Sequence, residues 1–427
     1  MTTTADIIDK TEDKDVELVT FGCRLNIYES EVMRTHARDA GMRDAIIFNT
    51  CAVTKQAEAA ARHAIRKARR ENPDKEIIVT GCAAQINPDM FGKMKEVDRI
   101  IGNDLKLKAE SWGGAASKDR MNVNDIMAVT ETAGHLISGF EGHARAFVQV
   151  QNGCDHRCTF CIIPYGRGNS RSVPIGEIVA QVRELVSQGY KEVVLTGVDV
   201  TSYGPDLPGK PTLGQMMRRL LALVPELPRL RLSSLDPVEI DEDMWLLIEN
   251  EPRLMPHLHL SLQAGDDMIL KRMKRRHLRQ DVIDVCAKAR QLRPDVVFGA
   301  DIIAGFPTET DEMFENTRKI VEECDLTYLH VFPYSEREGT PAAKMPQVDH
   351  KLRKDRAAIL RDLGVKQIAK RLDQYVGAEV EVLIEKNNTG HTPHFLPVKF
   401  QKELAEGQLV RAKLLSHDNE RMMAEVL

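Results

Sequence analysis

The stretch QNGCDHRCTFCIIPYGRG, residues 151–168, carries three cysteines within eight positions, directly after an apolar run. A structural zinc site normally closes with four ligands. Cys154, Cys158 and Cys161 are only three, and His156 lies inside the loop among charged neighbours. Soft thiolates also select copper(I) and iron–sulfur clusters. A four-iron cluster held by three cysteines leaves one iron open for a small molecule, and we favour this interpretation. Structural zinc and a Cys158/Cys161 redox pair remain as alternatives.

Composition sets the class of protein. The chain has 427 residues, 42% of them hydrophobic and 29% charged, and its net charge is −5, which is ordinary for a globular protein of two or three domains. The acidic N-terminus has no apolar segment of the kind found in signal peptides. No run approaches the roughly 20 apolar residues that span a bilayer. We therefore expect a cytoplasmic protein with reduced thiols and no membrane partner.

Reduced thiols change how the eight cysteines are interpreted. In a reducing compartment, clustered cysteines indicate metal binding or catalysis and not a disulfide framework. Cys286 and Cys324 lie in apolar helical patterns, and we expect them to be buried packing residues. The remaining six cysteines form two groups of three.

The segment before the motif repeats one unit three times. VELVT leads to FGCRLN, AIIFN to TCAVT and EIIVT to GCAAQ, and each apolar run is typical of a buried parallel strand. Helical patterns at residues 27–39 and 55–70, and a fourth run VDRIIG, complete a small open α/β domain. Cys23, Cys51 and Cys82 each follow a strand by one to three residues. Since the carboxyl ends of parallel strands share one edge, we expect these thiols to converge there.

The cysteine motif at residues 151–168 begins a longer alternation of strands and helices. Six βα units follow in about 190 residues, which predicts a partial (β/α)6 barrel with its site at the carboxyl ends of the strands. The expected strands are 146–151, 192–196, 230–234, 257–262, 296–303 and 328–332. The expected helices are 175–188, 213–224, 240–249, 279–292 and 309–323.

The chain as a whole is predicted to be an α/β protein of five segments. These are a disordered tail, an N-terminal α/β domain, a linker, the partial barrel and a small all-β domain with short alternating runs. Their expected boundaries are 1–15, 16–102, 103–144, 145–374 and 375–427.

The spacing C-x-x-x-C-x-x-C after the first strand of a partial barrel closely resembles the radical S-adenosylmethionine superfamily. The resemblance implies that Cys154, Cys158 and Cys161 hold a 4Fe-4S cluster whose open iron chelates S-adenosylmethionine, which is cleaved to a 5′-deoxyadenosyl radical. VVLTGVDV, containing Gly197, resembles the strand end that meets the cofactor's amino group. DIIAGFPTET, containing Gly305, resembles the motif that lies against its adenine. A glycine there lets the backbone approach a flat ring.

Taken together, the two cysteine groups resemble those of the methylthiotransferases, and the likeness runs from about Val16 to the C-terminus. The terminal segment resembles the RNA-binding TRAM domain of these enzymes. NTCAVT and CTFCIIPYGRGNSRS look most like the branch that modifies threonylcarbamoyladenosine beside the tRNA anticodon. Further matching stretches are FGCRLN, VTGCAAQ, RLSSLDP, LHLSLQAGDDMILKRMKR and VFPYSEREGTPAAKMP.

This resemblance implies a second 4Fe-4S cluster at Cys23, Cys51 and Cys82, where bound sulfur is methylated by one molecule of S-adenosylmethionine. A radical from a second molecule activates carbon 2 of the adenine, and the methylthio group is transferred there. No catalytic residue beyond the cluster ligands is expected. The implied partners are a tRNA substrate and an electron-donor protein, and we expect the chain to be a monomer.

An RNA substrate requires cationic side chains. The run KRMKRRHLR has six of these and no acidic residue, so we expect it to contact phosphates. Its cationic residues are Lys271, Arg272, Lys274, Arg275, Arg276 and Arg279. Two further basic groups lie at residues 62–70 and 351–371. The TRAM-like segment has six Lys or Arg against eight Asp or Glu, which does not indicate a strong RNA anchor. Phe395 and Phe400 are its candidates for stacking on bases.

Two other functions stay open on the sequence. Methylthiolation of an aspartate in a ribosomal protein would use the same chemistry on a protein substrate. A zinc-stabilised RNA-binding module without catalysis would use the cysteines for structure alone. The zinc module would be colourless, whereas both enzymes would be brown, with about eight irons per chain.

Overall fold

The N-terminal domain is a six-stranded sheet in the order β1-β2-β3-β4-β5-β6, parallel except for the antiparallel pair β1–β2. The computed structural model describes residues 7–12, 16–113, 119–131, 137, 139–140 and 143–427. The strands are β1 (Ile7–Glu12), β2 (Val16–Phe21), β3 (Ala45–Thr50), β4 (Glu76–Gly81), β5 (Arg99–Ile101) and β6 (Met121–Asn122). The helices are α1 (Arg24–Asp39), α2 (Lys55–Glu71), α3 (Cys82–Ile86) and α4 (Pro88–Gly92).

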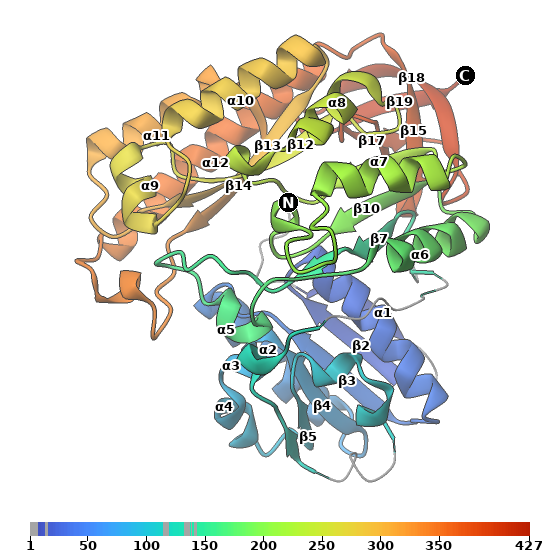
Figure 1. Ribbon diagram of the computed structural model, residues 1–427, viewed down its shortest axis with the longest axis vertical. Coiled ribbons are helices and arrows are strands. Elements are labelled where there is room, and N and C mark those ends of the chain that lie inside the picture. Colours follow the sequence, from blue (N-terminus) through green and yellow to red (C-terminus); the bar gives the residue numbers. More distant parts are fainter. Residues whose placement is uncertain (1–6, 13–15, 114–118, 132–136, 138, 141–142) are drawn as a thin grey trace.

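Helices cover both faces of this sheet, as the continuous apolar character of its central strands requires. Every residue of β3 is buried. Ile46 and Phe48 pack with Ala61 of α2, whereas Ile47 packs on the opposite face with Met33 of α1. The carboxyl ends of the strands face the central domain, which lies above the N-terminal domain in Figure 1.

Two predicted boundaries need correction. The predicted disordered tail, residues 1–15, includes Ile7–Glu12, which form β1 because β2 offers an open edge for pairing; its other residues lie outside the described part. The predicted linker, residues 103–144, contains β6, which extends the N-terminal sheet, and the buried Trp112, which packs in its core. The described residues up to Asn122 therefore belong to the N-terminal domain.

The central domain contains the six parallel strands that the sequence predicts, each within two residues of its expected ends. β7 (Ala146–Gln149), β10 (Glu192–Thr196) and β11 (Arg229–Leu232) form one sheet. β12 (His257–Gln263), β13 (Val297–Ala304) and β14 (Leu326–Pro333) form the other. The Leu235 N–H donates to the His259 carbonyl and the Leu235 carbonyl accepts from Ser261, both at 2.8 Å, which joins the two sheets. The partial (β/α)6 barrel is confirmed.

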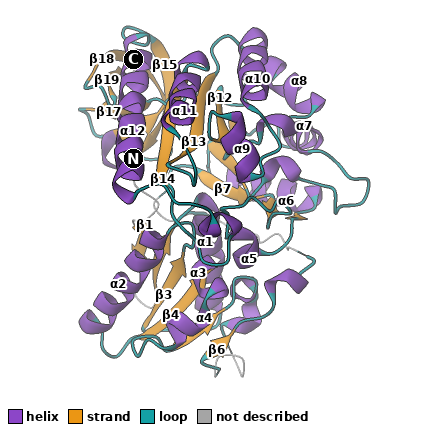
Figure 2. Ribbon diagram, turned by 90° about the vertical axis from the view of Figure 1, so that its left-hand side faces the viewer, coloured by secondary structure: helices purple, strands orange, loops and turns teal. Residues whose placement is uncertain are grey.

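Amphipathic helices cover the outside of the barrel (Figure 2). The five helices predicted within the barrel are present, namely α6 (Ile175–Ser187), α7 (Leu213–Leu223), α8 (Glu242–Asn250), α10 (Arg279–Leu292) and α11 (Asp311–Glu323). The basic group at residues 351–371 lies on a further helix, α12 (His350–Asp373). The sequence did not indicate the short helices α5 (Ile163–Arg167) and α9 (Asp267–Met273) or the small hairpin of β8 (Gln151–Asn152) and β9 (Arg171–Ser172). Among the described helices, none is both long and apolar enough to cross a membrane.

The C-terminal segment folds as a closed five-stranded barrel in the order β15-β16-β17-β19-β18, in agreement with the predicted all-β domain. Its core includes Val297 and Tyr328 of the central barrel, so the two domains share one apolar cluster. Arg229 of β11 also donates to Glu381 at 2.9 Å. The strands are β15 (Glu379–Glu385), β16 (Thr389–His391), β17 (Pro397–Phe400), β18 (Leu409–His417) and β19 (Met422–Val426).

Candidate metal centre

The barrel cysteines lie on a tightly folded loop after β8. Gly153 begins this loop with φ +73°, and a Cβ atom there would lie 1.9 Å from the Asn169 carbonyl oxygen. The Cys154 N–H donates to the Gly168 carbonyl at 3.1 Å, and the Cys161 N–H donates to the Cys158 carbonyl at 3.0 Å. These bonds hold the three half-buried thiols on one compact loop.

Arg275 reaches this loop from the segment after α9. Its Nη1 lies 3.7 Å from the Cys158 sulfur, and its Nη2 donates at 2.9 Å to Asp236 and at 2.8 Å to the Ser261 carbonyl. Burial opposes its charge, but Asp236 and Cys158 outweigh that effect and raise its pKa. The sequence grouped Arg275 with the predicted RNA-binding cations; the structure places it beside Cys158, a predicted cluster ligand.

Asp199 is a site residue that sequence reasoning missed. Its Oδ2 accepts from His156 Nε2 at 2.9 Å and lies 3.7 Å from the Cys154 sulfur. This hydrogen bond raises the pKa of His156, against the opposing effect of partial burial. Glu239 lies 3.9 Å from the same histidine nitrogen. Asp199 belongs to VVLTGVDV, so its place two residues after Gly197 was the available signal.

The N-terminal cysteines meet at the sheet edge, as their strand-end positions predict. Cys23 precedes α1, Cys51 follows β3, and Cys82 begins α3 after β4. Gly22 permits the close approach of the first two units, since a Cβ atom there would lie 2.9 Å from the Cys51 sulfur. The Cys51 sulfur accepts from Val53 N–H at 3.5 Å.

The two cysteine groups face each other across the domain interface. Gly166 of α5 packs on Cys82, because a Cβ atom on this glycine would lie 3.2 Å from the Cβ of Cys82. Asn103 spans the same contact: its Nδ2 donates to the Gly166 carbonyl at 2.7 Å and lies 3.7 Å from the Cys82 sulfur. Cys161, five residues before Gly166, is close enough for Cys82 to act on its pKa.

Buried charges fasten this interface. Arg167 of α5 donates to Glu29 Oε1 at 2.7 Å and to Asn26 Oδ1 at 2.6 Å, both on α1. Lys106 donates to Glu29 Oε2 at 2.7 Å from the segment that was expected to be a linker. Burial raises the pKa of Cys23, and the positive charge of Arg167 partly opposes this effect.

The spacing of the sulfur atoms does not suit a single zinc ion in either cysteine trio. Ligands around one zinc ion lie about 3.8 Å apart, because each Zn–S bond is about 2.3 Å. Among the described residues, neither cysteine trio has its three sulfurs within 4.8 Å of one another. A cubane spreads its ligands further, since each cysteine binds a different iron. Burial raises the pKa of Cys51 and of Cys161 to about 12. Without a metal these thiols therefore keep their protons at neutral pH, and a metal ion that binds them displaces the proton.

The two predicted cofactor glycines have nearby protein neighbours. A Cβ atom on Gly197 would lie 2.8 Å from the Gln151 carbonyl oxygen. Gly305 has φ +71°, and a Cβ atom there would lie 2.4 Å from Cγ of Arg353 on α12. The sequence predicted a glycine here so that the backbone could approach a flat ring. The structure gives another reason for glycine at this position, because α12 packs closely against it.

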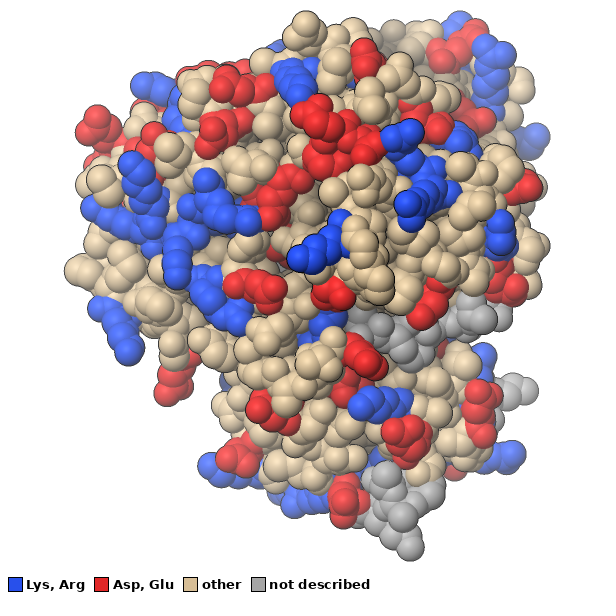
Figure 3. Space-filling model, viewed as in Figure 1, with Lys and Arg blue, Asp and Glu red and all other residues tan. Residues whose placement is uncertain are grey.

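The predicted RNA-binding cations divide into paired and unpaired residues. Figure 3 shows Lys and Arg gathered over the region of α9. Arg276 pairs with Glu239 and Arg279 with Glu323, while Arg272 donates to the Thr308 carbonyl at 3.2 Å. The two cations of this run that are exposed and have no such bond to a described residue are Lys271 and Lys274.

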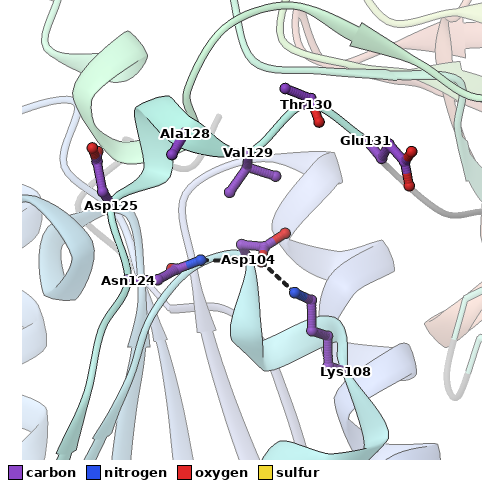
Figure 4. Close-up of a pocket in the computed structure, with 8 residues that line it drawn as sticks. All are labelled: Asp104, Lys108, Asn124, Asp125, Ala128, Val129, Thr130 and Glu131. Atoms are coloured by element: carbon purple, nitrogen blue, oxygen red, sulfur yellow. Dashed lines mark hydrogen bonds and ion pairs between the residues drawn. The ribbon is translucent and has the colours of Figure 1, made fainter.

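A surface pocket of about 380 Å³ lies apart from the cysteines. Figure 4 shows Lys108 paired with Asp104 at 3.0 Å and Asn124 donating to the same carboxylate at 3.3 Å. No cysteine lines this pocket. Lys108 and Asp104 neutralise each other, and the pocket contributes nothing to the candidate metal centre.

Comparison with known families agrees with this geometry. Residues 148–321 match the radical SAM superfamily, and residues 15–102 match a family described as uncharacterized protein family UPF0004. The radical S-adenosylmethionine methyltransferase TsrM of Kitasatospora setae, solved with cobalamin and a [4Fe-4S] cluster, superposes with a TM-score of 0.54. The match covers 74% of each chain at 16% identity, and it concerns the fold alone. Fold and cysteine motif together define a radical SAM enzyme.

Sequence relatives narrow this class. The threonylcarbamoyladenosine tRNA methylthiotransferase MtaB of Rickettsia prowazekii is 62% identical over 399 residues, covering 93% of this chain and 94% of the relative. A tRNA-2-methylthio-N(6)-dimethylallyladenosine synthase of Bacillus velezensis is 33% identical, covering 94% of this chain and 84% of the relative. The chain belongs to the radical SAM methylthiotransferase family, in the branch of the threonylcarbamoyladenosine tRNA methylthiotransferases.

Proposed function

We propose that this protein adds a methylthio group to carbon 2 of threonylcarbamoyladenosine in tRNA. The observation that carries the proposal is the meeting of two cysteine trios at one domain interface, where Gly166 packs on Cys82. One trio alone would suit an ordinary radical enzyme. A second trio, in contact with the first loop, supports a second 4Fe-4S cluster where sulfur can be held beside the site of radical formation. The reaction belongs in the cytoplasm, where tRNA and reducing conditions are found.

The residues around Cys154 suit S-adenosylmethionine. When bound, a cluster at Cys154, Cys158 and Cys161 supplies the electron that cleaves this cofactor. Asp199 follows β10 by three residues, Glu239 lies in the segment after β11, and both carboxylates lie near His156, where an ammonium group could bind them. We assign the cofactor's amino group to this pair, with Gly197 and Gly305 as the backbone positions along the rest of it.

Two arginines serve the thiolates. Arg275 donates to Cys158, and Arg167 lies beside Cys23 and Cys82 with Glu29 fixing its position. A cluster with thiolate ligands carries net negative charge, so nearby guanidinium groups stabilise it and raise its reduction potential. The protein residues thus hold and tune the two centres, in keeping with a mechanism in which no acid–base residue is required.

We further propose that tRNA lies across the face that carries Lys271 and Lys274. Both are exposed, and they flank the segment that touches the cysteine loop, where Thr159 N–H donates to the Met273 carbonyl at 3.0 Å. Arg272, Arg276 and Arg279 add positive charge nearby. An electron-donor protein is also required, because cluster reduction needs an external electron.

The test combines iron counting with nucleoside analysis in three variants. Purified without oxygen and reconstituted, the wild type should hold about eight irons per chain and form methylthio-threonylcarbamoyladenosine from tRNA that lacks the methylthio group. Cys82→Ala should keep about four irons, still release 5′-deoxyadenosine, and form no methylthio nucleoside. Cys158→Ala should also keep about four irons but release no 5′-deoxyadenosine.

Cys286→Ala is the matched control, because this thiol is buried in α10 outside the site. It should keep both clusters and full activity. The proposal fails if the wild type leaves threonylcarbamoyladenosine unchanged under reducing conditions. It also fails if Cys82→Ala retains eight irons and wild-type product formation, since the N-terminal trio would then hold nothing that the reaction needs.

A further inference from the structure

Three arginines converge on one phenylalanine ring where the three domains meet. Phe395 belongs to the C-terminal domain, Arg145 and Arg231 to the barrel, and Arg24 to the N-terminal domain. Their guanidinium carbons lie 5.2, 4.9 and 6.0 Å from the ring centroid, in the order Arg145, Arg231 and Arg24. Phe395 has φ +65°, a left-handed conformation that is rare for a bulky residue and is held here by its surroundings.

Two of the three guanidinium groups are neutralised by carboxylates. Arg231 donates to both oxygens of Glu192, at 2.9 and 3.2 Å. Arg145 Nε lies 3.1 Å from Glu192 and also pairs with Glu385. Arg24 differs from both, because it forms no hydrogen bond or ion pair with any residue that the structure describes.

The acidic groups nearest to Arg24 are already engaged. Glu192 serves the other two arginines, and Asp301 of β13 accepts from His259 at 3.1 Å and from His330 at 3.3 Å. Both carboxylates act on Arg24 only through space. Its fork of donors is therefore available to an additional anion.

The surroundings of Arg24 favour such an anion. The side chain is half-buried. A guanidinium group stays charged in proteins at neutral pH. An unpaired charge in a partly desolvated position is costly, and a bound anion removes that cost.

The position of Arg24 places this anion close to the N-terminal cysteines. Arg24 directly follows Cys23 and begins α1, so it is anchored beside a proposed cluster ligand. Its guanidinium is close enough to the barrel strands to act through space on His257, His259 and Asp301. A molecule bound there lies between the N-terminal cysteines and the strands of the barrel.

We infer that Arg24 binds the carboxylate of the substrate's threonyl group and so determines specificity. This inference rests on the proposed function. Threonine attached through its amino group keeps a free carboxylate, whereas the dimethylallyl group named for the Bacillus velezensis relative has no charge. A guanidinium fork binds a carboxylate through two parallel hydrogen bonds, and this geometry discriminates strongly against a neutral group.

The test uses two synthetic anticodon stem-loops, one with threonylcarbamoyladenosine and one with its methyl ester. Both carry the same phosphates, and only the first has the carboxylate. For the wild type, kcat/KM should be higher with the acid than with the ester. Arg24→Met should lower kcat/KM for the acid by about 10- to 100-fold, mainly through KM, and change the ester less than about threefold. The dissociation constant of each stem-loop, measured without S-adenosylmethionine, should follow the same pattern.

Two further variants complete the design. Arg24→Lys keeps a positive charge but loses the fork of donors. The ratio of kcat/KM for the acid to kcat/KM for the ester should therefore fall several-fold below the wild-type ratio and remain above the ratio for Arg24→Met. Arg38→Met carries the same replacement at the exposed far end of α1 and should match the wild type. Iron content is measured in every variant, and Arg24→Lys decides the question if Arg24→Met loses iron.

The outcomes separate this inference from the proposed function. If the wild type converts neither stem-loop, the proposed function is wrong and the inference falls with it. If the wild type converts the acid but Arg24→Met weakens acid and ester equally, the inference alone is overturned, and Arg24 contacts a phosphate or the cofactor's carboxylate. Equal use of acid and ester by the wild type also overturns it.

Discussion

At the residue scale, Glu29 is a buried carboxylate held between Arg167 and Lys106, which come from different segments of the chain. Burial alone would raise the pKa of Glu29, but the two cations outweigh it and lower the pKa to about 2. The ionised form is therefore the form that the folded protein favours. Because Arg167 also lies beside Cys23 and Cys82, this charge cluster links the domain interface to the cysteines.

The lowered pKa of Glu29 predicts a stability that depends on pH. The stabilisation, about 3 kcal/mol, is fully present above the ordinary pKa of 4.5 and is lost as the pH falls from there toward 2. Glu29→Gln should thus lower the free energy of unfolding at pH 7. Below about pH 4.5, the free energies of unfolding of the variant and the wild type should approach each other. Urea unfolding of the cluster-free protein, followed by Trp112 fluorescence in a Trp245→Phe background, measures this. Asp39→Asn, at the exposed end of α1, should show no such trend.

At the element scale, the position of Cys82 depends on a tight strand-to-helix turn. Gly81 ends β4 with φ +94° and ψ −174°, a conformation that side chains rarely adopt. A Cβ atom there would lie 2.4 Å from both the backbone nitrogen and oxygen of Thr50. The next residue is Cys82, so the turn fixes where this thiol begins α3.

Gly81→Ala should therefore displace Cys82 as well as destabilise the domain. The strained φ alone costs about 1–3 kcal/mol, and the contact with Thr50 adds to it because backbone atoms cannot move aside easily. We expect reconstituted iron to fall from about eight to about four per chain, with 5′-deoxyadenosine release retained. Gly41→Ala separates the two effects, since Gly41 also has a positive φ but no atom within 4 Å of a new Cβ. Wild-type iron in Gly81→Ala would contradict this role.

At the scale of the whole molecule, the residues of the candidate centre come from all three domains. The N-terminal domain supplies three cysteines and Arg24, the barrel supplies three cysteines and Asp199, and the C-terminal domain supplies Phe395. The C-terminal domain was a doubtful RNA anchor on its charge. In the structure, Phe395 stacks between His257 and His391, with ring centroids 5.2 and 4.4 Å away, and thus helps to dock this domain on the barrel.

Binding of tRNA over the exposed face of α9 predicts a change in salt dependence. Replacing Lys271 and Lys274 by alanine removes two exposed charges, so the slope of log K against log salt should become less steep by about 1.5. The affinity should fall for every tRNA alike, since phosphate contacts carry no sequence information. Lys93→Ala with Lys95→Ala, two exposed lysines beside α4, is the control and should leave the slope unchanged. Equal slopes for both double variants would place the RNA elsewhere.

The sequence by itself determined the elements and the two cysteine groups. Continuous apolar runs predicted the ends of the parallel barrel strands to within two residues, and helical periodicity predicted the helices that cover them. Cysteines at strand ends could be placed at one edge, because parallel strands share a direction. Short or charged elements escaped detection: β1 and β6 became strands only because the sheet offered an edge.

Only the tertiary structure decided which charged side chains serve the site. Arg275, which the sequence grouped with the predicted RNA-binding cations, donates to Cys158, 117 positions away in the chain. Arg167 pairs with Glu29 across 138 positions. A buried charge needs a partner, but sequence spacing carries no information about which distant residue provides it. The same holds for Arg24: among the residues that the structure describes, the acidic groups around it are engaged by other side chains, and only the tertiary structure shows this.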